Sequence, residues 1–473
     1  MTAGLLNALR DALGEGAVLT DPDVTEGYAG DMMPLVPRGR PLAVVLPADT
    51  AQVQACVRAC AEAGTPLVPR GAGSGLTGAA NAVDGCVVLV TTRMNRILEL
   101  DADNRLAVVQ PGVVNLDLRK AAARHGLFYP PDPSSLDWCT LGGNLATNAG
   151  GLCCGKYGVT ADAVLGLEVV LADGALLRTG RRTVKGVAGY DLTRLFVGSE
   201  GTLGVITGAT LALKPLPAAP GTLIASFDAV EKAGDGVIRV VREGIVPSLM
   251  EIMDATSLRA SAAYLDTDLG GAGQQALLLC QSDSGGAAAD RELAAMERLC
   301  QEAGATFTHT TRDPAEGDLL LRARRVSLTA LEAQGAVMTE DVAVPRTRIA
   351  ELIAGCEKIG AAAGLTVAVV GHAGDGNMHP TVLYDRASPD EFRRAGEAFD
   401  AILALGLSLG GTVTGEHGIG KLKQEWLERE LGPVSMRVHR QLKAALDPGN
   451  LFNPGAVFSP DASTPAEADH GTP

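Results

Sequence analysis

The sequence lacks several features that would identify a class of protein directly. Aromatic residues make up only 3% of its 473 residues, and no Cys-x-x-Cys pair occurs among its nine cysteines. No apolar run approaches the roughly 18 residues that span a bilayer. The amino terminus shows no basic region followed by an apolar run, as a signal peptide would. We therefore expect a cytoplasmic protein with reduced thiols, no integral membrane segment, and no iron–sulfur cluster or haem of its own.

Positive charge is also scarce. The chain carries 40 Lys and Arg against 55 Asp and Glu, a net charge of −15. This balance argues against nucleic acid as a partner, because phosphate binding needs a basic face. Glycine is instead abundant, with 58 residues concentrated in five clusters. Such clusters mark places where the backbone passes close to a ligand or to another segment.

Strand and helix patterns alternate along the chain, which predicts an α+β protein. Three prolines in residues 214–220 divide a first domain, residues 1–217, from a second, residues 218–408. Residues 409–458 form a further segment, and we expect the tail, residues 459–473, to be disordered. The expected helices are residues 5–13, 51–63, 229–243, 287–303 and 347–363. The expected strands are residues 41–46, 66–69, 86–90, 107–110, 223–227, 275–281 and 367–370.

Two histidines flank an Asp-Gly pair in the motif Gly-His-Ala-Gly-Asp-Gly-Asn-Met-His, residues 371–379. A hairpin whose two-residue turn is Asp375-Gly376 would place His379 directly opposite His372. Opposed side chains share one face with Cβ atoms roughly 4.5–5.5 Å apart, so both imidazoles could bind one divalent ion. The alternative is a glycine-rich loop with incidental histidines.

A second motif, Gly-Glu-His-Gly at residues 415–418, offers the missing groups. Glu416 is the candidate third ligand, and zinc is the first candidate metal, with manganese or iron as alternatives. His417 is the candidate general base, because neighbouring residues on an extended segment point in opposite directions. A fourth metal ligand or a spectator is the alternative role for His417.

The first glycine cluster contains a formal Gly-x-Gly-x-x-Gly at Gly73, Gly75 and Gly78. A Rossmann site would require a helix immediately after this loop. Only residues 79–85, which include Asn, Asp and Gly, separate the loop from the next expected strand. We therefore reject a Rossmann NAD(P) site and expect a loop whose backbone N–H groups cradle a pyrophosphate.

Three more motifs follow this loop: Pro-Pro-Asp-Pro-Ser-Ser at 130–135, a glycine-rich segment at 140–151, and residues 189–207 with Gly-Ser-Glu-Gly at their centre. With the histidine motifs, they make the chain resemble the FAD-linked D-2-hydroxy acid dehydrogenases. This branch of the vanillyl-alcohol oxidase/p-cresol methylhydroxylase flavoproteins holds the glycolate oxidase flavoprotein subunit, D-lactate dehydrogenase and D-2-hydroxyglutarate dehydrogenase. The resemblance covers about residues 20–458. It implies a two-part FAD-binding domain, a substrate (cap) domain, and a C-terminal segment that returns to the flavin.

The resemblance also implies which residues hold FAD. Relatives with covalent FAD use a histidine in the glycine loop, and this loop has none, so we expect a dissociable cofactor. The implied FAD contacts are Arg70, Gly71, Ala72, Gly73, Ser74, Gly75, Thr77, Gly78, Pro133, Ser134, Thr140, Gly143, Asn144, Thr147, Glu200, Gly201, Ile206 and Asn453.

The implied reaction is the oxidation of a small 2-hydroxy acid, with a hydride passing to the flavin. The same metal ligands are implied, with His417 contacting the substrate and removing its hydroxyl proton. Arg324 would bind the carboxylate, although it could also belong to a solvated helix face. Hydroxyglutarate-type relatives carry a lysine where Thr339 aligns and an asparagine where Thr381 follows His379. D-lactate or glycolate is therefore favoured.

Several questions stay open at this stage. D-2-hydroxyglutarate dehydrogenase, another alcohol oxidase of the superfamily, and a zinc hydrolase with a degenerate flavin-like domain are the alternatives. The electron acceptor could be an iron–sulfur partner subunit, a soluble carrier, quinone or oxygen. The chain could form a homodimer, and a partner could hold it at the membrane periphery.

Overall fold

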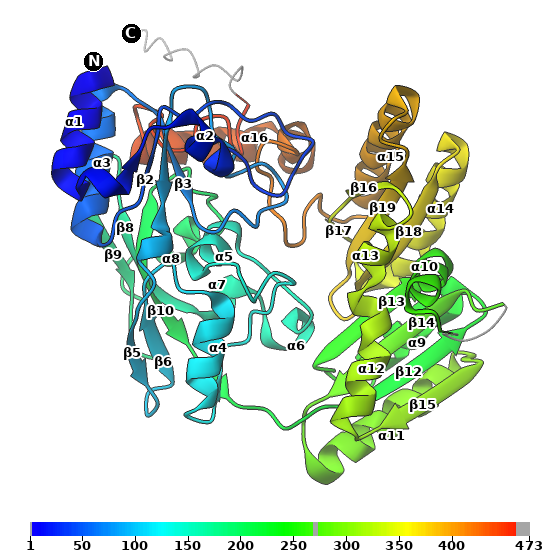
Figure 1. Cartoon of the computed structure of the whole chain (residues 1–473). Helices are drawn as coiled ribbons and strands as arrows, with labels where there is room; N and C mark the ends of the chain where they lie inside the picture. The colour runs from blue at the N-terminus through cyan, green and yellow to red at the C-terminus, as the bar shows by residue number, and fades with distance from the viewer. Residues whose placement is uncertain (1, 268–272, 460–473) are drawn as a thin grey trace, which may run out of the picture.

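The computed structural model describes residues 2–267 and 273–459 of the chain. Figure 1 shows two lobes: one contains the amino-terminal part together with helix α16, and the other contains the middle of the chain. The tail that the sequence predicts to be disordered, residues 459–473, lies outside the described residues except for Ser459.

A small sheet of order β1-β2-β4-β3 begins the first lobe, and β2, β4 and β3 run parallel. Helix α3 starts where the Asp49 side chain accepts the backbone N–H of Gln52 at 2.9 Å, and it ends at Gly64 with φ of 59°. The expected strands and helices are all present here. The elements are α1 (Thr2–Leu13), β1 (Val18–Leu19), α2 (Pro22–Thr25), β2 (Ala43–Val45), α3 (Thr50–Ala63), β3 (Leu67–Arg70) and β4 (Val87–Val90).

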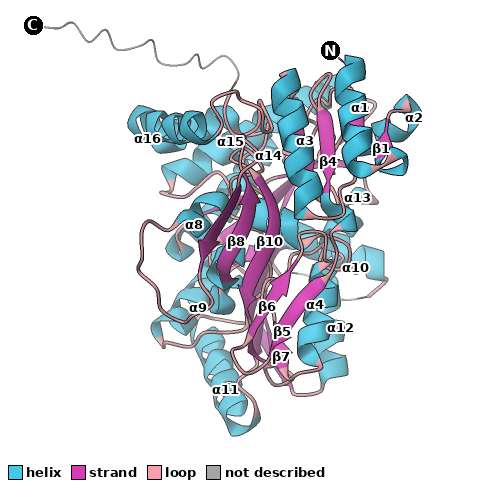
Figure 2. Ribbon diagram, turned by 90° about the vertical axis from the view of Figure 1, so that its left-hand side faces the viewer, coloured by secondary structure: helices cyan, strands magenta, loops and turns pink. Residues whose placement is uncertain are grey.

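An antiparallel sheet of order β5-β6-β10-β8-β9 completes this lobe, and Figure 2 shows its strands running side by side. Of its strands, the sequence predicted only β6. The elements are β5 (Ile97–Asp101), β6 (Leu106–Val109), α4 (Asn115–Ala123), α5 (Leu141–Thr147), α6 (Cys154–Tyr157), α7 (Thr160–Ala163), β8 (Val164–Val170), β9 (Leu176–Gly180), α8 (Leu192–Phe196) and β10 (Val205–Ala212). A separate pair is formed by β7 (Leu127–Phe128) and β11 (Lys214–Pro215).

The second lobe is built on one large sheet of order β15-β12-β14-β13-β18-β19-β16, with β17 also paired to β19. Its strands are β12 (Gly221–Phe227), β13 (Leu249–Asp254), β14 (Ala276–Ser282), β15 (Phe307–Thr311), β16 (Ala336–Thr339), β17 (Val342–Ala343), β18 (Thr366–His372) and β19 (Asn377–Tyr384). Its helices are α9 (Val230–Arg242), α10 (Ala255–Leu265), α11 (Gly286–Glu302), α12 (Pro314–Arg325), α13 (Ser327–Glu332), α14 (Ile349–Ala363) and α15 (Pro389–Ser408).

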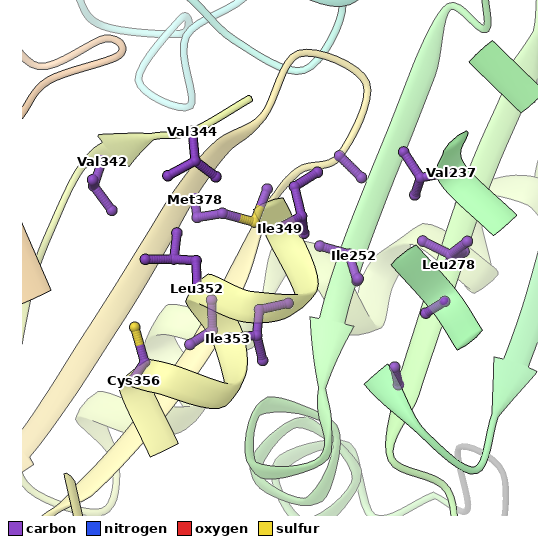
Figure 3. Close-up of a cluster of buried hydrophobic side chains, with 14 of the residues drawn as sticks. Val237, Ile252, Leu278, Val342, Val344, Ile349, Leu352, Ile353, Cys356 and Met378 are labelled. Carbon is purple, nitrogen blue, oxygen red and sulfur yellow. The ribbon is translucent and has the colours of Figure 1, made fainter. Parts of the chain in front are cut away.

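One face of this sheet carries the main core of the lobe. Figure 3 shows Ile349, Leu352 and Ile353 of α14 packed among Ile252 and Met378 from the strands. Helices α9, α11 and α15 contribute to the same cluster. The opposite face packs on α10, α12 and α13 through smaller clusters. His372 and His379 of the β18–β19 hairpin lie on this second face, together with Val370.

The chain then returns to the first lobe through α16 (Gln424–Leu446), which the sequence patterns did not predict. Gly432, with φ of 71° and ψ of 171°, kinks this helix immediately before Pro433. Beyond it, Phe452 pairs with Leu67, and the backbone N–H of Asn453 donates to the Leu67 carbonyl at 2.9 Å. The carboxyl-terminal segment therefore adds directly to the sheet that precedes the first glycine loop.

Candidate active site

The hairpin of β18 and β19 brings the two histidines together, but in a different register from the expected one. His372 pairs with Asn377, and His379 pairs with Val370, so the predicted direct opposition is wrong. The turn has four residues, 373–376, because the His372 carbonyl accepts the N–H of Gly376 at 2.9 Å. The shift is two residues, which preserves the face of every side chain. The histidines are thus diagonal neighbours, with their Nε2 atoms 3.4 Å apart.

Glu416 completes the predicted ligand set. Its Oε1 lies 3.5 Å from Nε2 of His372, and its Oε2 lies 4.0 Å from Nε2 of His379. Ligands held about 2.0–2.1 Å from a tetrahedral ion would lie about 3.3–3.4 Å from one another. The three side chains therefore suit one divalent ion such as zinc with only a small adjustment.

The two imidazoles differ in protonation. Burial, followed by the charges of His372 and His417, lowers the pKa of His379 to about 3, so this ring is neutral and able to bind a metal. Burial acts to lower the pKa of His372 as well, but the Glu251 and Glu416 carboxylates outweigh it and raise that pKa well above the ordinary range. A metal ion would therefore have to displace a proton from His372.

Asp341 fixes the loop that carries Glu416 and His417, and the sequence patterns gave it no role. Its Oδ2 accepts the Thr414 hydroxyl at 2.7 Å and the N–H groups of Gly415, Glu416 and His417 at 2.8–3.0 Å. Burial would raise the pKa of Asp341, but the charge of His417 and these donated hydrogen bonds hold it well below its usual range. The ionised carboxylate thus anchors residues 414–417.

His417 stacks against His379, with ring centroids 5.4 Å apart and planes inclined by 14°. Donor atoms of Asp341, His379 and His417 also lie within 4.8 Å of one another, which is a second geometry in which His379 could share a ligand set. Oδ2 of Asp341 accepts four hydrogen bonds, but Oδ1 has no hydrogen-bond partner among the described residues, so both ligand sets have a carboxylate oxygen to offer.

Arg324 lies near this centre, but behind the ligands. Its Nε donates to Oε2 of Glu251 at 2.7 Å, and Oε1 of the same carboxylate lies 2.5 Å from Nδ1 of His372. Arg324 is therefore not on a solvated helix face: its side chain is only 14% exposed. Sequence patterns missed Glu251, because a single acid in the apolar strand β13 carries no motif.

A cavity of about 380 Å³ lies in the first lobe and extends to the histidine centre. Glu416 and His417 line one end of it. The predicted FAD contacts that line it are Arg70, Gly71, Ala72, Gly73, Ser74, Gly75, Pro133, Ser134, Gly143, Asn144, Thr147, Glu200, Gly201 and Ile206. The cavity wall also includes Asp31, Pro111 and Trp138, which no motif indicated.

The glycine loop is shaped as a backbone cradle. A Cβ on Gly71 would lie 2.2 Å from Oγ1 of Thr140, and one on Gly73, whose φ is +82°, would lie 2.1 Å from a guanidinium nitrogen of Arg70. No helix follows the loop before β4, as expected. Only glycine permits this close approach of backbone to wall, and such a surface fits the pyrophosphate of a dinucleotide.

Four predicted FAD contacts lie outside the cavity lining: Thr77, Gly78, Thr140 and Asn453. Thr77 accepts the N–H groups of Lys421 and Leu422 through its carbonyl. Asn453 is 1% exposed, and its Nδ2 donates to the carbonyls of Ala79 and Glu200 at 2.8 Å each. Thr77 and Asn453 thus support the cavity wall through these hydrogen bonds, and direct FAD contact by the four residues stays a prediction.

Glu200 joins the cavity wall to the catalytic loop. Its two carboxylate oxygens accept the N–H groups of Ile419 and Gly420 at 2.8 and 2.7 Å. Burial raises the pKa of this carboxyl to about 7, against the lowering effect of the two hydrogen bonds. The flavin-side loop and the histidine-side loop are thus bonded directly to each other.

Family comparisons agree with this architecture. Residues 41–180 match the model of an FAD binding domain, and residues 216–457 match the C-terminal domain of FAD linked oxidases. The chain belongs to this family of FAD-linked oxidoreductases. In the described residues, no helix has the length and apolar character needed to cross a membrane.

Individual relatives narrow the comparison. The chain is 41% identical to glycolate oxidase subunit GlcD of Bacillus subtilis, over 92% of each chain. It is 34% identical to a D-lactate dehydrogenase of Anaerostipes hadrus, over 93% of this chain and 94% of the relative. Among solved structures, p-cresol methylhydroxylase superposes with a TM-score of 0.80 at 21% identity, covering 97% of both chains, which shows a shared fold.

Proposed function

We propose that this protein oxidises a small D-2-hydroxy acid, glycolate or D-lactate, to the corresponding 2-oxo acid. One observation carries the proposal: Glu416 and His417 line the same cavity as the glycine loop. The site that would bind the acid and the site that fits FAD are therefore continuous. The names of the relatives, glycolate oxidase subunit and D-lactate dehydrogenase, support the same substrate class.

The chemistry requires two groups that the chain would hold. FAD supplies the acceptor for the two electrons that leave with the C2 hydrogen. A divalent ion, zinc in the first instance, would be held by His372, His379 and Glu416, and it supplies positive charge that favours loss of the hydroxyl proton.

The chain's own residues orient the acid and move its proton. His417 is held by Asp341 through its backbone and by stacking on His379 through its ring. In this position it would accept the hydroxyl proton as the general base. Arg324, whose Nε donates to Glu251, would bind the substrate carboxylate through its terminal nitrogens.

D-2-hydroxyglutarate carries a second carboxylate, and the positions of Thr339 and Thr381 offer no cation to bind it. Thr339 and Thr381 are paired across β16 and β19, and their hydroxyl oxygens lie 3.2 Å apart. These hydroxyls therefore satisfy each other, two residues along the strand from His379. A monocarboxylate fits this neutral, closed pair better than a dicarboxylate does.

Electrons must leave the enzyme after each turnover. Two relatives are named as a subunit of glycolate oxidase, which supports an electron-accepting partner chain. We propose such a partner, and with it a location in the cytoplasm or at the membrane periphery, in preference to direct use of oxygen.

Anaerobic titration of the purified, zinc-loaded holoenzyme tests the proposal. We expect glycolate or D-lactate to bleach the flavin absorbance near its visible maximum, and D-2-hydroxyglutarate to do so poorly. The double variant Thr339→Lys, Thr381→Asn should shift the preference toward D-2-hydroxyglutarate. A flavin that none of the three acids bleaches would refute the substrate class, and a folded protein that retains no FAD would refute the whole assignment.

A further inference from the structure

The strand β13 carries one acid, Glu251, that the reaction as described above does not use. Its side chain is completely buried, at 0% exposure. The neighbours on its face of the sheet are apolar: Leu249, Met253, Leu279 and Val370 surround this position in one buried cluster or in the paired strand. A carboxylate in such surroundings is costly unless both oxygens have partners.

Both oxygens have partners, and the two partners belong to different parts of the site. Oε1 lies 2.5 Å from Nδ1 of His372, and Oε2 accepts Nε of Arg324 at 2.7 Å. The strand register creates the first contact, because Glu251 and His372 are directly opposed on β13 and β18. The second partner comes from the last turn of α12.

We infer that Glu251 is a positioning residue that orients both the metal ligand His372 and the substrate-binding Arg324. This inference rests on the proposed function. By accepting Nδ1–H of His372, it fixes the tautomer in which the Nε2 lone pair points at His379 and Glu416. By binding Nε of Arg324, it holds the guanidinium plane so that the terminal nitrogens stay available for a carboxylate.

In this arrangement one carboxylate controls the orientation of both His372 and Arg324, which would otherwise be independent. Rotation of Glu251 away from His372 would also release Arg324, and loss of Arg324 would leave one buried oxygen without a partner. The metal position and the carboxylate-binding position are therefore held at a fixed separation by a single side chain.

The test compares Glu251→Gln with Asp254→Asn in the purified holoenzyme. Asp254 is a matched control because it ends the same strand. Its carboxylate accepts the Ser257 N–H at 2.7 Å and does not contact the histidines. We expect Glu251→Gln to weaken zinc binding, measured by competition with a chelating dye, by about 10–100-fold. Asp254→Asn should bind zinc as the wild type does, and both variants should keep stoichiometric FAD.

The KM for the hydroxy acid, as a second readout, separates a positioning role of Glu251 from a general loss of structure. At saturating zinc, Glu251→Gln should raise the KM for the hydroxy acid by about tenfold or more, the effect of removing one charge-assisted contact. Arg324→Lys should raise the KM similarly while leaving zinc affinity unchanged. Glu251→Asp, whose shorter side chain can keep one partner, should restore part of the zinc affinity.

The outcomes are distinguishable from failure of the proposed function. Wild-type zinc affinity in folded, FAD-loaded Glu251→Gln would overturn the inference while leaving the function intact. A wild-type protein that binds no zinc would overturn both this inference and the metal site. Reduction of the flavin by the hydroxy acid, measured separately in the wild type, tests the proposed activity itself.

Discussion

Gly150 and Glu416 lie in such close contact that a Cβ added to Gly150 would be 2.5 Å from Oε1 of Glu416 and 2.9 Å from its Cδ. Gly150 follows α5 in the first lobe, whereas Glu416 belongs to the segment that follows the second lobe. The glycine therefore sets how closely the flavin-binding part approaches the Glu416 carboxylate. No larger side chain can occupy this position without moving that carboxylate.

Replacing Gly150 with alanine should displace the Glu416 carboxylate rather than unfold the protein, because the end of a side chain moves more easily than backbone. We expect zinc affinity to fall by about 10–100-fold, as for other disturbances of ligand orientation. Gly27→Ala is the control, since a Cβ there has no neighbour within 4 Å. Equal zinc affinity of the two variants, measured by dye competition, would contradict the placement of Glu416.

Replacing His417 with glutamine should remove the general base while preserving both cofactors. The rate constant of flavin reduction by the preferred acid should fall by about 10²–10⁴-fold in anaerobic stopped flow. FAD and zinc contents should stay at wild-type values, because His417 is not in the ligand set. His439→Gln, on the exposed side of α16, should reduce flavin at the normal rate. Loss of zinc in the His417 variant would instead assign this residue as a fourth ligand.

Replacing Gly73 with alanine should abolish FAD retention. Gly73 and Gly85 both have positive φ, +82° and +74°, but only a Cβ on Gly73 would meet a neighbour, the Arg70 guanidinium. Both alanine variants should lose about 1–2 kcal/mol of stability from the strained backbone. Only the Gly73 variant should emerge from desalting without flavin. If Gly85→Ala lost flavin to the same extent, backbone strain rather than close approach would explain the effect.

Glu200 should make stability depend on pH in a defined direction. The pKa of this buried carboxyl is about 7 in the folded chain, against an ordinary value of 4.5. Between these values the folded state holds a proton that the unfolded state has released, so the wild type loses stability as pH rises from 4.5 to 7. Glu200→Gln lacks this loss and should gain up to about 3 kcal/mol relative to wild type between pH 5 and pH 8.

Thermal unfolding of the flavin-free wild type and Glu200→Gln at the two pH values provides the measurement. Other carboxyls with raised pKa, such as Glu340, contribute equally to both proteins and cancel in the difference. A difference in Tm that does not change with pH would show that Glu200 ionises normally in the folded state.

The sequence predicted the parts of the site that depend on local chemistry. The glycine loop at residues 69–78 and the candidate metal ligands His372, His379 and Glu416 were all proposed from residue type and spacing. The structure brings the glycine loop and Glu416 to one cavity, and it places His372 and His379 beside Glu416. The hairpin register was wrong because the four-residue turn is stabilised by the His372 carbonyl, a backbone interaction without a side-chain pattern. The shared face survived because the shift was an even number of residues.

The supporting carboxylates could not have been found in the same way. Glu251 and Asp341 are single acids in apolar or mixed segments, and their importance comes from partners 121 and 76 positions away in the chain. Helix α16 was missed because Gly432 and Pro433 interrupt its apolar pattern. The sequence patterns did not predict β8 and β10, because each strand contains a glycine, which weakens the strand pattern. Long-range packing, rather than local propensity, determines all of these elements.

The pairing of Leu67 with Phe452 has a consequence for biosynthesis. Leu451 and Phe452 complete the buried cluster that also holds Val53, Cys56 and Leu67. Domains usually fold in the order in which they leave the ribosome, but here the first lobe emerges without two of its core side chains. The buried cluster of the first lobe can therefore be completed only when nearly the whole chain has been translated. The core of the second lobe, by contrast, is complete at Trp426, before Leu451 and Phe452 are added to the chain.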